Sequence, residues 1–196
     1  MIKGTYKPKF QKVYDILHNQ IKSDYELGAA VSVELNGEEV INLWGGYTSE
    51  SKEKLWAENT IVNVWSVTKA VTGVCIAKLI SDDKLDINER VSYYWPEYGV
   101  NGKENTKVID FLSHRAGMFG FQGGYPDANW NDWTIYTDSL QSQKPFREPG
   151  SSQGYHAVTF AWLVGELIKR VDGRTVGKYF KDEFAKPLNL DFHIGL

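Results

Sequence analysis

The stretch VWSVTKAV, residues 64–71, opens a long apolar segment and places Ser66 three residues before Lys69. A helix advances about 100° per residue, so both side chains lie on one face, one turn apart. The lysine nitrogen then stands at the positive end of the helix dipole and among apolar neighbours, where a positive charge is disfavoured. A lysine held neutral there can take the serine proton and create a nucleophile. The alternative is a serine that caps the helix above an ordinary surface lysine.

A second motif, GYHA at residues 154–157, stands at the entrance to another apolar helix. Where two helix starts face one cleft, a tyrosine at one of them can reach the polar groups of the other. The phenol of Tyr155 would then pass the proton of Ser66 to a leaving group. A tyrosine that packs at a helix start is the alternative interpretation.

The composition predicts one globular domain, residues 1–196, with 42% hydrophobic residues and a net charge of −3. Acidic and basic residues are interspersed, which argues against nucleic acid as a partner. Four scattered histidines lack the spacing of a metal site, so we expect no metal. No cofactor is expected either. The N-terminal residues contain no apolar core of a signal peptide, and no stretch approaches the length of a membrane span, so we expect a cytoplasmic protein.

The pattern along the chain predicts a helix and hairpin in residues 1–65 and a mostly helical region in residues 66–196. The hairpin turn is Asn36-Gly37, because a type I′ turn needs two positive φ angles. Residues 118–154 have little periodicity and are expected to form a long loop. The expected helices span residues 9–24, 66–82, 107–116, 158–171 and 176–185, and the expected strands span residues 29–35 and 39–44.

Several stretches resemble motifs of the serine β-lactamase-related hydrolases, in the family's order and spacing. They are VWSVTKAV (64–71), YWPE (94–97), LSHRAG (112–117) and GYHA (154–157) running into WLVGE (162–166). That group includes class C β-lactamases, penicillin-binding-protein-like enzymes and esterases, and the chain is most similar to the esterase-like branch. The resemblance implies an α/β (α+β) fold with a helical region and an N-terminal antiparallel hairpin.

The resemblance also implies residue roles. Ser66 would be the acylated nucleophile, Lys69 its activating neighbour and Tyr155 the shared acid and base, with the Ser66 backbone N–H as half of the oxyanion hole. The implied function is hydrolysis of small carboxylic esters through an acyl-enzyme, with room for weak β-lactam hydrolysis. The positions expected to contact substrate are Trp65, Phe121, His156 and Ala157.

Two departures from the family pattern affect these expectations. Ala157 stands where β-lactamases usually carry an asparagine, which favours esters over β-lactams. The family's third motif, Lys-Thr-Gly or His-x-Gly on a strand, is matched by letter at residues 193–195, but only one residue follows. We therefore expect a truncated domain without the C-terminal sheet strands. Such a chain would leave an apolar face of the hairpin without partners, and would self-associate or need a complementing C-terminal polypeptide.

Rival interpretations remain open. Residues 150–154 match the G-x-S-x-G nucleophile elbow at Ser152, but the preceding residues, KPFREP, do not read as a core strand. His114 beside Ser113 is expected to bond loop backbone near Gly117 rather than to act as a base. The aromatic residues Phe119, Phe121, Tyr125, Trp130 and Trp133 would either wall an acyl pocket or cover the helical core. A catalytically impaired fragment that serves as a binding or interaction module is the alternative to an enzyme.

Overall fold

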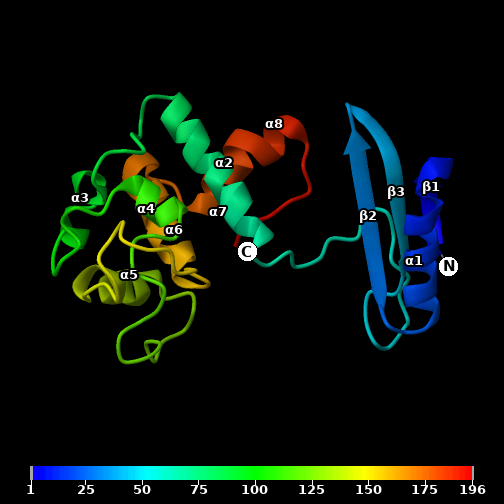
Figure 1. Cartoon of the computed structure of the whole chain (residues 1–196), viewed down its shortest axis with the longest axis horizontal. Helices are drawn as coiled ribbons and strands as arrows, with labels where there is room; N and C mark the ends of the chain where they lie inside the picture. The colour runs from blue at the N-terminus through cyan, green and yellow to red at the C-terminus, as the bar shows by residue number, and fades with distance from the viewer. Residues whose placement is uncertain (1, 196) are drawn as a thin grey trace. The chain divides into compact units, whose positions relative to one another are not determined.

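The computed structural model describes residues 2–195 and divides into two compact units, Met1–Val62 and Asn63–Leu196 (Figure 1). The division lies close to the expected change from a sheet-containing to a helical region at residue 65. The fold is mixed α/β with a small antiparallel sheet, as the sequence predicted. Each unit is described by itself.

The first unit holds a three-stranded antiparallel sheet in the order β1-β3-β2, where β1 is Ile2–Tyr6, β2 Gly28–Leu35 and β3 Glu38–Gly46. Asn36 and Gly37 have φ angles of 54° and 78°, so the predicted type I′ hairpin is confirmed. The strand β1 was not predicted. Its central residue, Gly4, has φ 101°, and a Cβ there would stand 1.9 Å from the carbonyl oxygen of Asn42. Only glycine therefore fits the pairing of β1 with β3.

The helix α1, Gln11–Lys22, follows a short 3₁₀ turn at Pro8–Phe10 and packs on this sheet. Leu17 of α1 is buried together with three residues of β3, Val40, Ile41 and Leu43. Val40 and Ile41 are adjacent, whereas Leu43 is two positions after Ile41. A bulge between Val33 and Glu34 puts an extra residue on β3, which lets neighbouring residues share one core. The expectation that the apolar face of the hairpin lacks partners was therefore wrong for β3.

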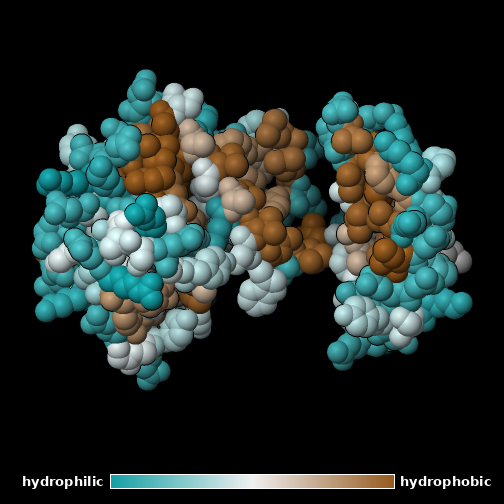
Figure 2. Space-filling view, viewed as in Figure 1, coloured by the Kyte–Doolittle hydropathy of each residue, from teal (hydrophilic) through white to brown (hydrophobic). Residues whose placement is uncertain are grey.

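The outer strand β2 keeps some apolar surface. Val33 and Leu35 are 37% and 45% exposed, and Figure 2 shows brown, apolar surface on this unit. The row of backbone groups along β2 that faces away from β3 pairs with no strand among residues 2–195. An edge of this kind is open to pairing with another chain segment.

The second unit is helical around two apolar helices, α2 (Val67–Ser81) and α6 (Thr159–Asp172), which contact each other. Both match the predicted helices. Helix α6 is buried along most of its length and ends at Gly173, whose φ of 89° closes the helix in the left-handed conformation. The remaining elements are α3 (Val91–Tyr94), η2 (Pro96–Tyr98), α4 (Val108–Leu112), α5 (Trp133–Ser142), α7 (Val176–Phe180), a π-helical turn η3 (Lys181–Ala185) and α8 (Lys186–Leu188).

Two expectations about this unit need correction. The expected long loop contains a helix, α5, whose core-facing apolar residues Trp133, Tyr136 and Leu140 lie at helical spacing. The last helical segment continues to Leu188 instead of stopping before Pro187. Pro187 lies in the first turn of α8, where its missing N–H removes no helical hydrogen bond.

Candidate active site

Ser66 stands immediately before α2, on a turn with an unusual backbone. Trp65 has a φ of 49°, a conformation that a bulky residue rarely adopts, and its N–H donates to Asn63 Oδ1 at 3.0 Å. Such a conformation costs about 1–3 kcal/mol and persists only where the surroundings hold it. The turn leaves Ser66 exposed and Trp65 79% exposed, so the hydroxyl is open to a substrate.

The three predicted catalytic side chains meet at the Ser66 hydroxyl. Ser66 Oγ lies 2.7 Å from the Tyr155 hydroxyl and accepts a hydrogen bond from Lys69 Nζ at 3.2 Å. Lys69 Nζ also donates to the carbonyl oxygen of Ala157 at 2.7 Å. Lys69 comes from the first turn of α2, whereas Tyr155 and Ala157 come from the turn before α6. The packing of α2 on α6 thus brings together residues 89 positions apart.

The environment of Tyr155 favours its deprotonated form. Hydrogen bonding to Ser66, followed by the neighbouring Lys69 side chain, holds the pKa of Tyr155 below its ordinary value. The Lys69 nitrogen also lies 5.1 Å from the centre of the Tyr155 ring and 5.7 Å from that of Phe160. A phenol with a lowered pKa, in contact with a serine hydroxyl, is suited to accept and return a proton.

The backbone N–H of Ser66 is free to bind a developing oxyanion. The next three amides are used within the turn: Val67 N–H donates to Val64, Thr68 N–H to Trp65 and Lys69 N–H to Ser66. Within residues 2–195, the Ser66 N–H donates to no acceptor. It lies at the N-terminal end of α2, where the helix dipole favours negative charge.

Two of the residues expected to contact substrate lie elsewhere. His156 is fully buried: its Nε2 accepts from the Met118 N–H at 3.1 Å, and its Nδ1 lies 2.6 Å from the Gly154 carbonyl oxygen. Burial lowers the pKa of His156 to about 4, so the ring is neutral. Phe121 is only 9% exposed and packs against Tyr136 and Trp162. Trp65 and Ala157, by contrast, are exposed beside Ser66.

Four of the five aromatic residues of the loop belong to the helical core or cover it, which is one of the two roles expected for them. Phe121 and Trp133 belong to the helical core, with Trp133 Nε1 donating to Glu166 at 2.6 Å. Tyr125 and Trp130 lie over that core and are each 58% exposed. The Phe119 ring packs against the Gly154 backbone, where a Cβ would stand 2.8 Å from it. Phe119 is therefore the aromatic residue of the loop that contacts the Tyr155 turn.

His114 has a role that the sequence did not predict. It was expected to bond backbone near Gly117, yet its carbonyl oxygen accepts from Gly154 N–H and its Nδ1 accepts from His156 N–H. Its ring lies 4.9 Å from the Tyr155 ring. The available signal was its place in the LSHRAG stretch and its position directly after α4.

The rival nucleophile, Ser152, lacks the surroundings of an elbow. Within residues 2–195, the last strand before Ser152 is β3, which ends at Gly46, so no strand leads directly into it. The Ser152 Oγ accepts a long hydrogen bond from Arg147 at 3.3 Å. His193, the histidine that this alternative would need, is paired with Asp191 at 2.9 Å. The G-x-S-x-G match therefore does not correspond to a strand–turn–helix nucleophile.

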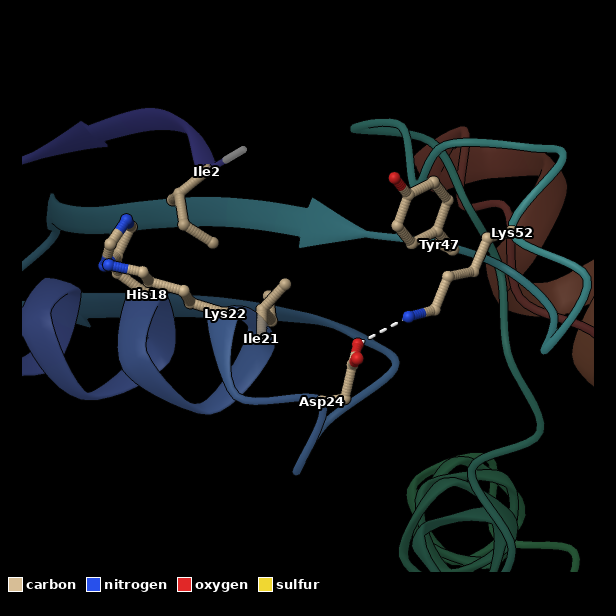
Figure 3. A pocket seen from close by; sticks show the side chains of 7 residues that line it. All are labelled: Ile2, His18, Ile21, Lys22, Asp24, Tyr47 and Lys52. Atoms are coloured by element: carbon tan, nitrogen blue, oxygen red, sulfur yellow. Dashed lines mark hydrogen bonds and ion pairs between the residues drawn. The ribbon is translucent and has the colours of Figure 1, made fainter.

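The first unit contains a separate cavity of about 300 Å³. Figure 3 shows it between α1 and the sheet, with the Lys52–Asp24 ion pair of 2.6 Å at one end. The cavity is lined by Ile2, His18, Ile21, Lys22, Asp24, Tyr47 and Lys52. No predicted site residue is among them.

Two kinds of feature are absent from residues 2–195. No helix there is long and apolar enough to cross a membrane. No group of three or more His, Cys, Asp or Glu side chains in the same range is arranged to hold a metal ion.

Known proteins match this chain over nearly its whole length. The family described as Beta-lactamase matches residues 16–195. The esterase/beta-lactamase LipL of Mycobacterium tuberculosis is 31% identical over 193 residues, which cover 98% of this chain and 44% of LipL. A penicillin-binding protein homolog from Caulobacter crescentus is 35% identical with a TM-score of 0.93, over 100% of this chain and 53% of that one. A family VIII carboxylesterase is 36% identical with a TM-score of 0.91, over 100% of this chain and 54% of that one.

The chain thus spans about half the length of the relatives that it matches. The resemblance inferred from its motifs is confirmed, as is the fold class. On the extent of the family match and on the identity to LipL, this chain belongs to the Beta-lactamase family, whose relatives here include esterases and penicillin-binding protein homologs.

Proposed function

We propose that the chain is a serine hydrolase that acts on small carboxylic esters through an acyl-enzyme on Ser66. One observation carries the proposal: the Ser66 hydroxyl lies within hydrogen-bond reach of both Tyr155 and Lys69. Covalent catalysis requires a nucleophile in contact with a base, and a third group that orients the base. The relatives described as an esterase and as a carboxylesterase support ester substrates. So does Ala157, whose side chain has no amide to bind a β-lactam.

In the acylation step, Ser66 Oγ attacks the carbonyl carbon of the ester and its proton passes to the Tyr155 oxygen. Lys69 stabilises the negative charge of the tyrosine before this transfer. The carbonyl oxygen becomes an oxyanion, which the Ser66 N–H binds. When the tetrahedral intermediate collapses, the bond to the alcohol oxygen breaks and Tyr155 returns its proton to the leaving alcohol.

In the deacylation step, water attacks the acyl carbon and gives a proton to Tyr155. The bond between the acyl carbon and Ser66 Oγ then breaks, and the proton returns to Ser66. The carboxylic acid leaves and the starting state is restored. No cofactor enters either step.

Intact-mass spectrometry after exposure to a fluorophosphonate tests the proposal. The wild-type chain and Ser152→Ala should each gain one adduct, because Ser66 is activated in both. Ser66→Ala should gain none. If Ser66→Ala still gains the adduct and Ser152→Ala gains none, the assignment of Ser66 is overturned.

A second candidate is a chain that needs another polypeptide, or another copy of itself, to act. Three apolar residues beside the nucleophile favour it: Val64, Trp65 and Val67 are 38%, 79% and 57% exposed. Analytical ultracentrifugation with a hydrophobic-dye assay tests this candidate. A monodisperse monomer that binds no dye and turns over esters would contradict it, whereas association or dye binding without turnover would support it.

A further inference from the structure

We propose that His114 is a positioning residue that holds the Tyr155 phenol against Ser66. The inference rests on the proposed function, since it assigns a role at the same site. His114 is not part of the proton transfer, because its hydrogen bonds go to the turn that carries Tyr155 rather than to Ser66.

His114 binds the chain on both sides of Tyr155. Its carbonyl oxygen accepts from the N–H of Gly154 at 2.9 Å, and its ring Nδ1 accepts from the N–H of His156 at 3.2 Å. The His114 ring also contacts the Tyr155 ring edge-on, with centres 4.9 Å apart and planes at 66°. One residue thus fixes the residue before Tyr155, the residue after it and the ring itself.

The hydrogen bond to His156 requires a neutral His114. A ring nitrogen accepts a hydrogen bond only when it carries no proton, so the proton of His114 lies on Nε2. Burial, and then the nearby Lys69 charge, lower the pKa of His114 below its ordinary value. The acceptor is therefore present at neutral pH, and Lys69 supports Tyr155 both directly and through this neighbour.

The other side of the turn is fixed by His156. Its buried ring joins Met118 to the Gly154 carbonyl oxygen, and its own N–H is the donor to His114. Gly154 is further restricted by the Phe119 ring. The turn therefore cannot shift as a whole, and the contribution left to His114 is the direction in which Tyr155 points.

The backbone of His114 decides which substitutions test this role. Its φ is 59°, in the left-handed region that glycine adopts freely and asparagine tolerates. Asparagine also carries an acceptor oxygen at the δ position, where His114 has Nδ1. His114→Asn therefore keeps the backbone and the acceptor, whereas His114→Gly keeps the backbone and removes the acceptor and the ring.

The experiment compares rates of acylation by a fluorophosphonate in these variants. His114→Gly should lower the rate about 10- to 100-fold, since a displacement of about 1 Å at a reacting group has effects of this size. His114→Asn should stay within about threefold of wild type. The matched control is Ser113→Ala, which loses only a hydrogen bond to the Ile109 carbonyl oxygen at the end of the same helix and should react at the wild-type rate. Equal losses in His114→Gly and His114→Asn would overturn the role of the acceptor.

A double-mutant cycle with Tyr155→Phe separates positioning from a general loss of structure. If His114 acts through the phenol, His114→Gly should cause no further loss in the Tyr155→Phe background. A full second loss there would show a merely structural role. If His114→Gly does not fold, His114→Gln replaces it, because its polar atoms lie at the ε position and leave the His156 N–H without its acceptor.

A readout without catalysis keeps the inference distinct from the proposed function. NMR of the chain labelled with [ζ-¹³C]tyrosine, with the Tyr155 signal assigned by its loss in Tyr155→Phe, reports the pKa of this phenol. In His114→Gly or His114→Gln that pKa should rise toward the ordinary value of about 10, and His114→Asn should retain the wild-type value. An unchanged pKa in all variants would overturn the positioning role, whether or not the wild-type chain is acylated. Absence of wild-type acylation would count against the proposed function alone.

Discussion

Lys69 Nζ donates a hydrogen bond of 2.7 Å to the backbone carbonyl oxygen of Ala157, across 88 residues of sequence. This bond joins the first turn of α2 to the turn before α6 and directs the lysine nitrogen between Ser66 and Tyr155. Because the acceptor is a main-chain atom, the side chain at position 157 can change while the bond remains. Under the proposed function, Lys69 therefore keeps its position when the side chain at residue 157 changes.

Removal of the Lys69 nitrogen should abolish activation of Ser66. We expect Lys69→Met to lower the rate of fluorophosphonate acylation by about 10²- to 10⁴-fold, because Tyr155, the general base, loses the neighbour that stabilises its phenolate. Lys78→Met is the matched control on the same helix: it loses only the surface ion pair with Asp82 and should react at the wild-type rate. Equal losses in the two variants would mean that the helix, rather than the relay, had been damaged.

The rate of acylation should rise with pH as Tyr155 loses its proton. The active form of Tyr155 is the phenolate, whose fraction increases up to the pKa, and that pKa is lowered by Ser66 and Lys69. The rising limb of the pH–rate profile should therefore lie below about pH 10, the ordinary value for tyrosine. It should move to higher pH in Lys69→Met and vanish in Tyr155→Phe. A limb that persists in Tyr155→Phe would assign it to another group.

Substitution of Ala157 should change selectivity without removing the nucleophile. Ala157→Asn keeps the carbonyl oxygen that binds Lys69 and adds a side-chain amide beside an exposed Ser66. We expect the rate of acylation by a fluorophosphonate to stay within about threefold of wild type. The rate of acylation by a chromogenic cephalosporin, divided by that by an aryl ester, should rise about tenfold, which corresponds to one good hydrogen bond. An unchanged ratio would show that position 157 does not select substrate.

The pairing of β1 should depend on Gly4. Gly4→Ala would place a Cβ 1.9 Å from the Asn42 carbonyl oxygen at a φ of 101°, so we expect a loss of at least about 2 kcal/mol in the stability of the sheet. Gly37→Ala is the comparison, because Gly37 also has a positive φ but open space around it; its cost should be about 1 kcal/mol. Hydrogen exchange of the β1 and β3 amides measures both. Equal protection in the two variants would contradict the steric argument.

The helices α2 and α6 could be predicted because long apolar runs end at recognisable signals, such as Gly173. The hairpin was predicted from two short β-rich runs, residues 29–35 and 39–44, joined through Asn36-Gly37. Strand β1 was missed because its residues, IKGTY, carry no alternating apolar pattern, and its stability comes from pairing with β3. Helix α5 was missed although its core-facing residues Trp133, Tyr136 and Leu140 are three and four positions apart, because the run is short and lies in a region with little overall periodicity.

The site shows the same limit of local pattern. The Ser66–Lys69 pair could be predicted because helical geometry alone sets a spacing of three residues. The approach of Tyr155 to this pair depends on the packing of α2 on α6, so it came from the family resemblance. The contacts of His114 and the burial of His156 depend on a turn some 40 residues away from His114, and no local pattern indicates them.

All three side chains that meet at the Ser66 hydroxyl belong to the unit Asn63–Leu196. The proton relay proposed above would thus be encoded in one continuous stretch of the chain, without a residue from the sheet of the first unit. Changes in the sheet-forming sequence would then leave these three side chains in place.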